Sequence, residues 1–144
     1  MNPTTRISTA RQVGYVIAII FLIAFLIVLN NFQKWNLPLV SSLITPDFKN
    51  WLPAANLSIS VAIFLNFLFL LYDPAWFRHL MQAVQNTFSL FSTWKFYQLF
   101  PVSLPSPVFE SSLYWVLIVL MLLTALGMLV ELVRAITSYT KTQA

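Results

Sequence analysis

Long apolar runs separated by short polar segments dominate the sequence. Three runs, 13–30, 54–72 and 108–133, hold few charged residues over about the 20 residues that a helix needs to cross the hydrocarbon core of a bilayer. The first run follows two arginines, as in a signal peptide, but it is longer than a signal core and no small-residue cleavage pattern follows it. We therefore predict three membrane-spanning helices, the first of which is not removed.

The segment 31–53 has the composition of a membrane interface, with lysines, tryptophans and prolines. Thr45, Pro46 and Asp47 combine an N-cap residue, a first-turn proline and a first-turn acid. We expect an extracytoplasmic interfacial segment that contains a short helix. This helix should end or kink near Pro53, which cannot donate to the helical hydrogen-bond ladder.

The stretch 75–99 has a polar side and an apolar side at helical spacing. With 100° per residue, its polar side chains fall within an arc of about 140°. The uncharged middle of this arc, which we call the polar stripe, comprises Gln82, Gln85, Asn86, Ser89, Ser92 and Thr93. A helix on the membrane surface normally carries Lys and Arg along its polar side, whereas here the basic residues Arg78 and Lys95 stand at the two ends.

Length and charge both bear on whether this stretch crosses the membrane. Trp76 and Trp94 are 18 residues apart, or about 27 Å of helix, and tryptophan prefers the two edges of a hydrocarbon core that is about 30 Å thick. With four spans and a cytoplasmic N-terminus, five Lys and Arg residues lie inside and three outside, whereas three spans give four and four. Both observations favour a fourth span.

The predicted fold class is therefore all-α, an integral membrane helical bundle that forms a single domain. The predicted transmembrane helices are 13–30, 54–72, 75–99 and 108–133, and a polar tail follows from Thr137. Both termini then lie in the cytoplasm, and the location is the cell (inner) membrane. The alternative is three transmembrane helices plus one interfacial helix.

Composition agrees with a membrane protein and excludes several function classes. Hydrophobic residues make up 59% and charged residues 8% of the chain, whereas roughly 25% of the residues in soluble proteins are charged. The net charge of +4 comes from basic residues scattered singly, so no basic run exists for nucleic acid. No cysteine, one histidine and two glycines exclude thiolate chemistry, a multi-histidine metal site and a phosphate-binding glycine loop.

The polar stripe is the first candidate site, because amides and hydroxyls inside a bilayer must find hydrogen-bond partners. Candidate intramembrane partners on the other spans are Asn56, Ser60, Asn66 and Thr124. Two interpretations remain open. The stripe either cross-links helices or lines a water path or ligand groove that a second copy completes. Gly127, near Thr124, is expected to let another backbone approach closely.

The second candidate site is a group of charged residues at the predicted cytoplasmic edge. Its members are Asp73, Arg78, His79, Glu131 and Arg134. Glu131 can pair with Arg134 at i,i+3 or with Arg78 across the bundle, and His79 can join them. The group either binds a proton or a lipid headgroup, since histidine titrates near neutral pH, or consists of helix-end charges that reach the interface.

Three short strings resemble a group of small bacterial membrane proteins to which no function is assigned. They are Leu43-Ile44-Thr45-Pro46-Asp47-Phe48, Asn56-Leu57-Ser58 and Tyr72-Asp73-Pro74. The resemblance covers most of the chain and implies a bacterial inner-membrane setting, but it carries no chemistry.

Three functional hypotheses follow. The four acids are dispersed and no nucleophile has a base beside it, so we expect neither an enzyme nor a cofactor-binding protein. The first hypothesis is a protein that acts through helix–helix contacts, as a homo-oligomer or as an accessory subunit of another membrane protein. The second is a small transporter or channel whose path is lined by the polar stripe. The third is binding of a membrane lipid by its headgroup at the charged group.

Overall fold

The computed structural model describes residues 8–31, 34 and 42–143. Within them the fold is all-α, as predicted. The long helices are α1 (Thr9–Asn31), α3 (Phe48–Leu71), α4 (Ala75–Leu99) and α5 (Pro107–Gln143). Residues 32, 33 and 35–41 of the predicted interfacial segment 31–53 lie outside the described residues.

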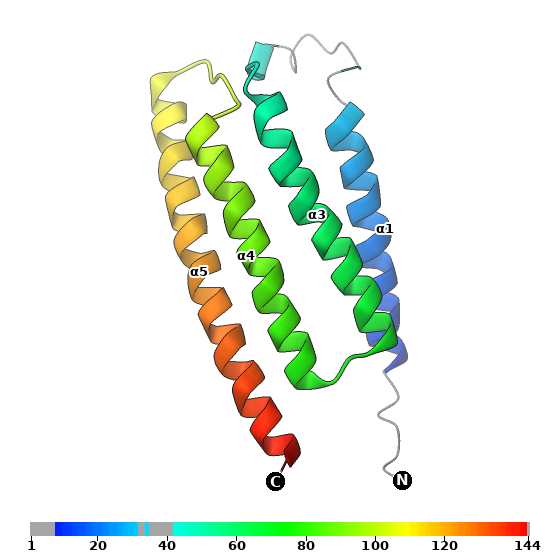
Figure 1. The fold of residues 1–144 in the computed structure, drawn as a ribbon. Helices are drawn as coiled ribbons and strands as arrows, with labels where there is room; N and C mark the ends of the chain where they lie inside the picture. Colours follow the sequence, from blue (N-terminus) through cyan, green and yellow to red (C-terminus); the bar gives the residue numbers. More distant parts are fainter. Residues whose placement is uncertain (1–7, 32–33, 35–41, 144) are drawn as a thin grey trace.

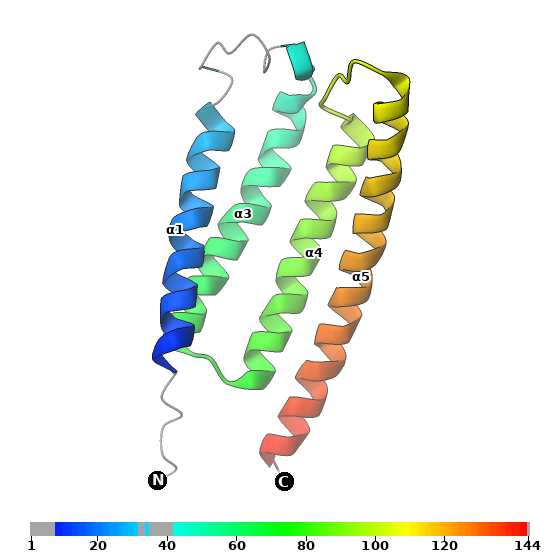
Figure 2. The ribbon, with the colours of Figure 1, turned by 180° about the vertical axis from the view of Figure 1, so that it is seen from behind.

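The helices lie side by side in chain order and form one layer. α3 packs against α1 on one side and against α4 on the other, and α4 packs against α5. Figures 1 and 2 view the two broad faces of this layer and show that neighbouring helices run in opposite directions. We call the edge where α1 begins and α5 ends the terminal edge, and the edge with the α4–α5 loop the loop edge.

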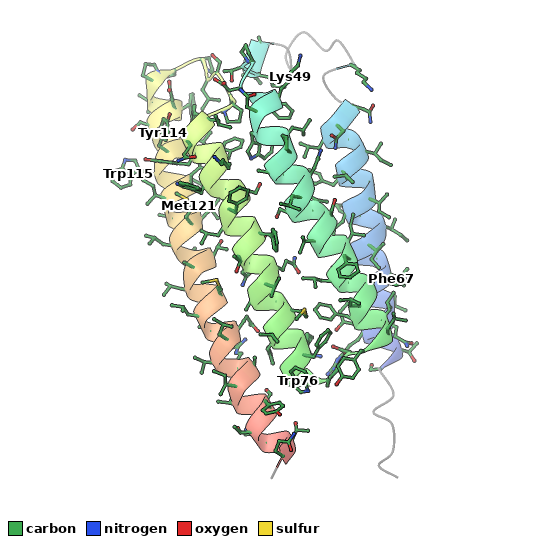
Figure 3. All side chains as sticks on the ribbon, viewed as in Figure 1. Lys49, Phe67, Trp76, Tyr114, Trp115 and Met121 are labelled. Atoms are coloured by element: carbon green, nitrogen blue, oxygen red, sulfur yellow. The ribbon has the colours of Figure 1, made fainter. Side chains whose placement is uncertain are left out.

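Three of these helices, α1, α3 and α5, are long and apolar enough to cross a membrane. Large apolar side chains on the flanking helices are exposed, including Phe21 at 76% and Trp115 at 67%. Figure 3 shows Trp115 pointing away from the layer. A surface this apolar is stable against lipid rather than water, which agrees with the membrane location predicted from the sequence.

Burial is uneven between the two central helices. α3 buries several residues along its length, among them Ala55, Leu65 and Phe69. α4 also lies between two helices, but Ala83 is its one buried residue in the described chain. The side chains of α4 therefore remain accessible on both broad faces of the layer.

α4 has the predicted bounds because local signals stop the helix at both ends. Pro74 occupies the N-cap position in an extended conformation, and Phe100 is the C-cap in the left-handed region, with φ of 40°. A residue before proline is disfavoured in the helical region, so Phe100-Pro101 cannot continue the helix. The Phe100 ring stacks on Tyr114, with 4.2 Å between the ring centroids, and this contact offsets part of the backbone strain.

A helix was expected to end or kink near Pro53, and of these two alternatives the end is wrong. α3 begins after Asp47, which takes the N-cap position expected for Thr45, and stays helical through Pro53 to Leu71. Pro53 is the sixth residue of α3, so its missing N–H leaves one carbonyl near the helix start without a helical donor. Packing of the first turn, where Phe48 is 4% exposed, holds the helix together across this position.

α5 extends beyond its predicted end at residue 133. It has 37 residues, or about 55 Å of helix, so the predicted polar tail from Thr137 to Gln143 is helical. The hydroxyls of Thr137, Thr140 and Thr142 donate to carbonyls three or four residues earlier. Figure 1 shows this part of α5 projecting past the end of α4 at the terminal edge.

A short backbone contact joins the two halves of the layer at the loop edge. The Thr45 N–H donates to the Pro101 carbonyl at 3.1 Å. The Ser103 N–H donates to the Leu43 carbonyl at 2.8 Å. The chain before α3 is thereby fastened to the loop between α4 and α5.

Candidate functional site

Asp73 lies in the connection between α3 and α4 at the terminal edge, and its side chain is 1% exposed. Arg78 of α4 places Nη1 3.1 Å from Oδ1 and 3.2 Å from Oδ2 of this carboxylate. Arg11 of α1 adds a second cation, with Nη1 3.5 Å from Oδ2, and Tyr15 of α1 lies next to Asp73 and Arg78. These four residues, which we call the Asp73 cluster, join α1 to the start of α4.

A second group of charges, which we call the Glu131 cluster, joins α4 to α5. His79 Nδ1 lies 2.6 Å from Glu131 Oε2, and Arg134 Nη1 donates to Glu131 Oε1 at 3.0 Å. The side chains of His79 and Glu131 are 19% and 16% exposed, so water competes little for their contact.

The five charged residues predicted as one group therefore form two clusters. Of the two partners considered for Glu131, Arg134 is in contact with it, whereas Arg78 turns to Asp73 five residues before it. Arg11 was not among the predicted site residues. The sequence did contain a signal that places Arg11 near Asp73. When successive helices alternate in direction, the start of the first helix lies at the same edge as the connection between the second and third helices.

All six residues of the polar stripe are partly buried. The stripe spans one side of α4, from Asn86, which lies beside Gly127 of α5, to Ser92, whose carbonyl accepts from Trp51 of α3. The Thr93 hydroxyl donates to the Ser89 carbonyl of its own helix at 2.9 Å. Within the part of the chain that the structure describes, the side-chain amides of Gln82, Gln85 and Asn86 form no hydrogen bond. The stripe thus presents unused donors and acceptors on a helix flanked by two apolar ones.

The opposite side of α4 is apolar. Phe91 is nine residues from Gln82, which at 100° per residue places it about 180° away around the helix. The side chains of Phe91 and Trp94 are 40% and 45% exposed. An open depression of about 450 Å³ on this side is lined by Thr87, Leu90, Phe91, Trp94 and Met121. This side suits lipid chains, in contrast to the polar stripe.

The residues predicted as partners of the stripe do not bond to it. Asn56 exchanges two hydrogen bonds with Asn30 of α1, each with 2.9 Å between nitrogen and oxygen. Asn66 and Thr124 donate to carbonyls of their own helices, and Ser60 is exposed. Helical spacing places a residue on a face of its helix, but it does not say which neighbour that face meets.

Gly127 of α5 faces the polar stripe, but it does not meet another backbone. A Cβ atom added at Gly127 would lie 3.5 Å from the side-chain Nδ2 of Asn86, which is ordinary van der Waals contact. The expected close backbone approach is therefore replaced by an amide side chain that lies over the glycine.

No group of three or more His, Cys, Asp or Glu side chains among the described residues is placed to hold a metal ion. Comparison with protein-family models, with curated proteins and with solved structures finds no match to this chain. The two charged clusters and the polar stripe are therefore the features that bear on function.

Proposed function

We propose that the chain is a small integral membrane protein with four transmembrane helices, and that it acts through contacts with other membrane helices rather than by catalysis. One observation carries the proposal. The amides of the polar stripe have no hydrogen-bond partner among the described residues, and they lie on a helix packed between two candidate membrane spans. In lipid such groups are costly until another molecule satisfies them.

The placement of α4 supports four spans over three spans and a surface helix. α4 has 25 residues, or about 37 Å of helix. It runs beside α3 and α5 from one edge of the layer to the other (Figures 1 and 2). A helix on the membrane surface would instead lie across the ends of the spanning helices.

The distribution of charge supports an orientation with both termini in the cytoplasm of the cell. The basic residues described at the terminal edge are Arg11, Arg78, Arg134 and Lys141, and those at the loop edge are Lys34, Lys49 and Lys95. Lys and Arg are more frequent on the cytoplasmic side of membrane proteins. Figure 3 shows Lys49 and Trp76 at opposite edges, where interfacial residues of a spanning layer belong.

The partner in this account is a further membrane helix, from a second copy or from another subunit. Hydrogen bonds between membrane helices contribute roughly 0.6–2 kcal/mol each, so several stripe residues together hold an assembly. A transport path along the stripe also requires a further helix that covers the stripe, because one layer of helices encloses no channel. Assembly is therefore the simpler function.

Binding of an anionic lipid headgroup at the terminal edge is a second candidate function. The side chains of Arg11 and Arg134 are 57% and 59% exposed, while the carboxylates that they contact are buried or nearly so. Each guanidinium therefore keeps donors for a phosphate group. This function is compatible with assembly, since it uses the membrane edge rather than the stripe.

The experiment is native mass spectrometry of the protein extracted gently from its membrane. We expect a complex larger than one chain, and we expect the double variant Gln82→Leu, Gln85→Leu to release single chains. The variant removes no hydrogen bond within the described chain, so its fold should persist. Gln98→Leu, at an exposed position of the same helix, is the matched control and should leave the complex intact.

Two results would contradict the proposal: a single chain for the unchanged protein, or an undiminished complex for the double variant. An anionic phospholipid retained in the same spectra would support the second candidate function.

A further inference from the structure

The polar stripe contains a heptad spacing that was not apparent from its polarity alone. Intervals of three, four and three residues separate Gln82, Gln85, Ser89 and Ser92. This is the a/d spacing by which one helix packs along another in a left-handed coiled coil. The eight residues from Gln82 to Ser89 make about two turns of helix, about 10 Å long.

Both ends of this row are closed by other parts of the chain. Toward the loop edge, Trp51 of α3 donates its Nε1–H to the Ser92 carbonyl at 3.1 Å, and its ring packs edge-on against Phe96 with centroids 5.0 Å apart. Toward the terminal edge, Arg78 is held by Asp73. The open part of the row, which we call the α4 seam, is Gln82, Gln85 and Ser89.

We propose that the α4 seam packs against the α4 seam of a second copy of this chain, about a two-fold axis along the membrane normal. The proposal rests on the proposed function, since it requires that α4 crosses the membrane. Copies inserted in the same orientation hold their α4 helices parallel. A two-fold axis then sets each seam residue opposite its own counterpart at the same depth.

A contact of this kind requires residues that are complementary to themselves, and the seam has them. A glutamine side chain carries both an amide donor and a carbonyl acceptor and has no charge. Two such side chains can therefore exchange hydrogen bonds without repulsion. Ser89 is small and also both donates and accepts, so it allows the two helices to come close.

The chain already uses this kind of bond between its own helices. Asn30 of α1 and Asn56 of α3 each donate to the other, at 2.9 Å in both directions. The seam repeats this chemistry with longer side chains and without an internal partner. A different protein would have to supply matching amides at the same depths, whereas a second copy supplies them by symmetry.

Cysteine cross-linking in native membranes tests the proposal, because the chain has no cysteine of its own. Single variants Gln82→Cys, Gln85→Cys and Ser89→Cys are treated with an oxidant or with a short membrane-permeant bis-maleimide. We expect a product of twice the chain mass at all three positions, because near a two-fold axis each cysteine lies close to the same cysteine of the second chain. Thr87→Cys and Phe91→Cys, exposed on the other side of α4, are the controls and should stay monomeric. Ser89→Cys is nearly isosteric and remains informative if a glutamine variant accumulates poorly.

Three outcomes would overturn the second copy as the occupant. They are no dimer at any seam position, equal dimer at the two control positions, or a seam product whose mass identifies a different protein. The last outcome would leave the proposed function standing, as would the first if native mass spectrometry still showed a complex. Absence of both a cross-link and a complex would remove the proposed function as well.

Discussion

Asp73 shows how a single charge can organise the terminal edge of the layer. A carboxylate removed from water is strongly destabilising unless cations or hydrogen-bond donors compensate it. Here the side chain is 1% exposed and contacts Arg78 of α4 and Arg11 of α1. Because Asp73 itself lies between α3 and α4, the cluster connects three helices at one point.

We expect Asp73→Asn to lower the free energy of unfolding by roughly 3–5 kcal/mol, the range for removing one partner from a buried ion pair. The substitution keeps the size of the side chain but leaves two guanidinium groups without a counter-charge. Thermal or denaturant unfolding in detergent micelles measures the change. Asp47→Asn is the control and should stay within about 0.5 kcal/mol of the unchanged protein, because Asp47 is exposed and makes no capping hydrogen bond. If both variants lowered the free energy of unfolding by similar amounts, the buried ion pairs of Asp73 would not be a main source of stability.

At the scale of helices, the Glu131 cluster is the polar contact that holds α4 against α5 near the terminal edge. Glu131→Gln should weaken this contact by roughly 1–3 kcal/mol, because the amide carries no charge and keeps only one of the two oxygens that His79 and Arg134 contact. Unfolding measurements detect the loss. Glu110→Gln, at an exposed first-turn position of α5, should cost less than about 1 kcal/mol. An unchanged stability for Glu131→Gln would show that apolar packing alone joins the two helices.

The bounds of α4 agree with local signals in the sequence, whereas contacts between helices could not be read from it. Asp73-Pro74 precedes the start of α4, and Phe100-Pro101 follows its end. Pro53 failed as a stop because packing of the first turn of α3 outweighs one missing hydrogen bond. Asn56 was predicted as a partner of the polar stripe on α4, but it bonds to Asn30 of α1. The helical periodicity of polar residues shows which of them share one face of a helix, but it does not show which neighbouring helix packs against that face.

The same limit applies to the candidate site. The polar stripe was recognisable from its residues, because amides at helical spacing within an apolar chain are unusual. Its lack of partners inside the described chain could not be known before the layer was seen. The split of the charges into two clusters likewise depends on Arg11, which lies far from Asp73 in the sequence and next to it in the fold.

At the scale of the whole molecule, the single layer is the reason why we propose that this protein binds a further membrane helix. A closed bundle satisfies its polar residues internally, whereas a layer leaves two broad faces open. One of these faces is apolar on α4 and suits lipid, and the other carries the polar stripe. Figures 1 and 2 show this open layer, and in the proposed assembly a further helix covers the polar stripe, as groups of this kind require in lipid.

The measurement that tests the account most directly is the sidedness of the two ends of α5. Ser103 lies in the loop before α5, Thr142 lies near its end, and both are exposed. In the account given above, Ser103→Cys reacts with an impermeant thiol reagent on intact cells, and Thr142→Cys reacts only after the membrane is opened. This result places the α4–α5 loop outside and the end of α5 inside, as four spans with a cytoplasmic N-terminus require. Protection of Ser103→Cys together with labelling of Thr142→Cys on intact cells would contradict four spans with both termini in the cytoplasm.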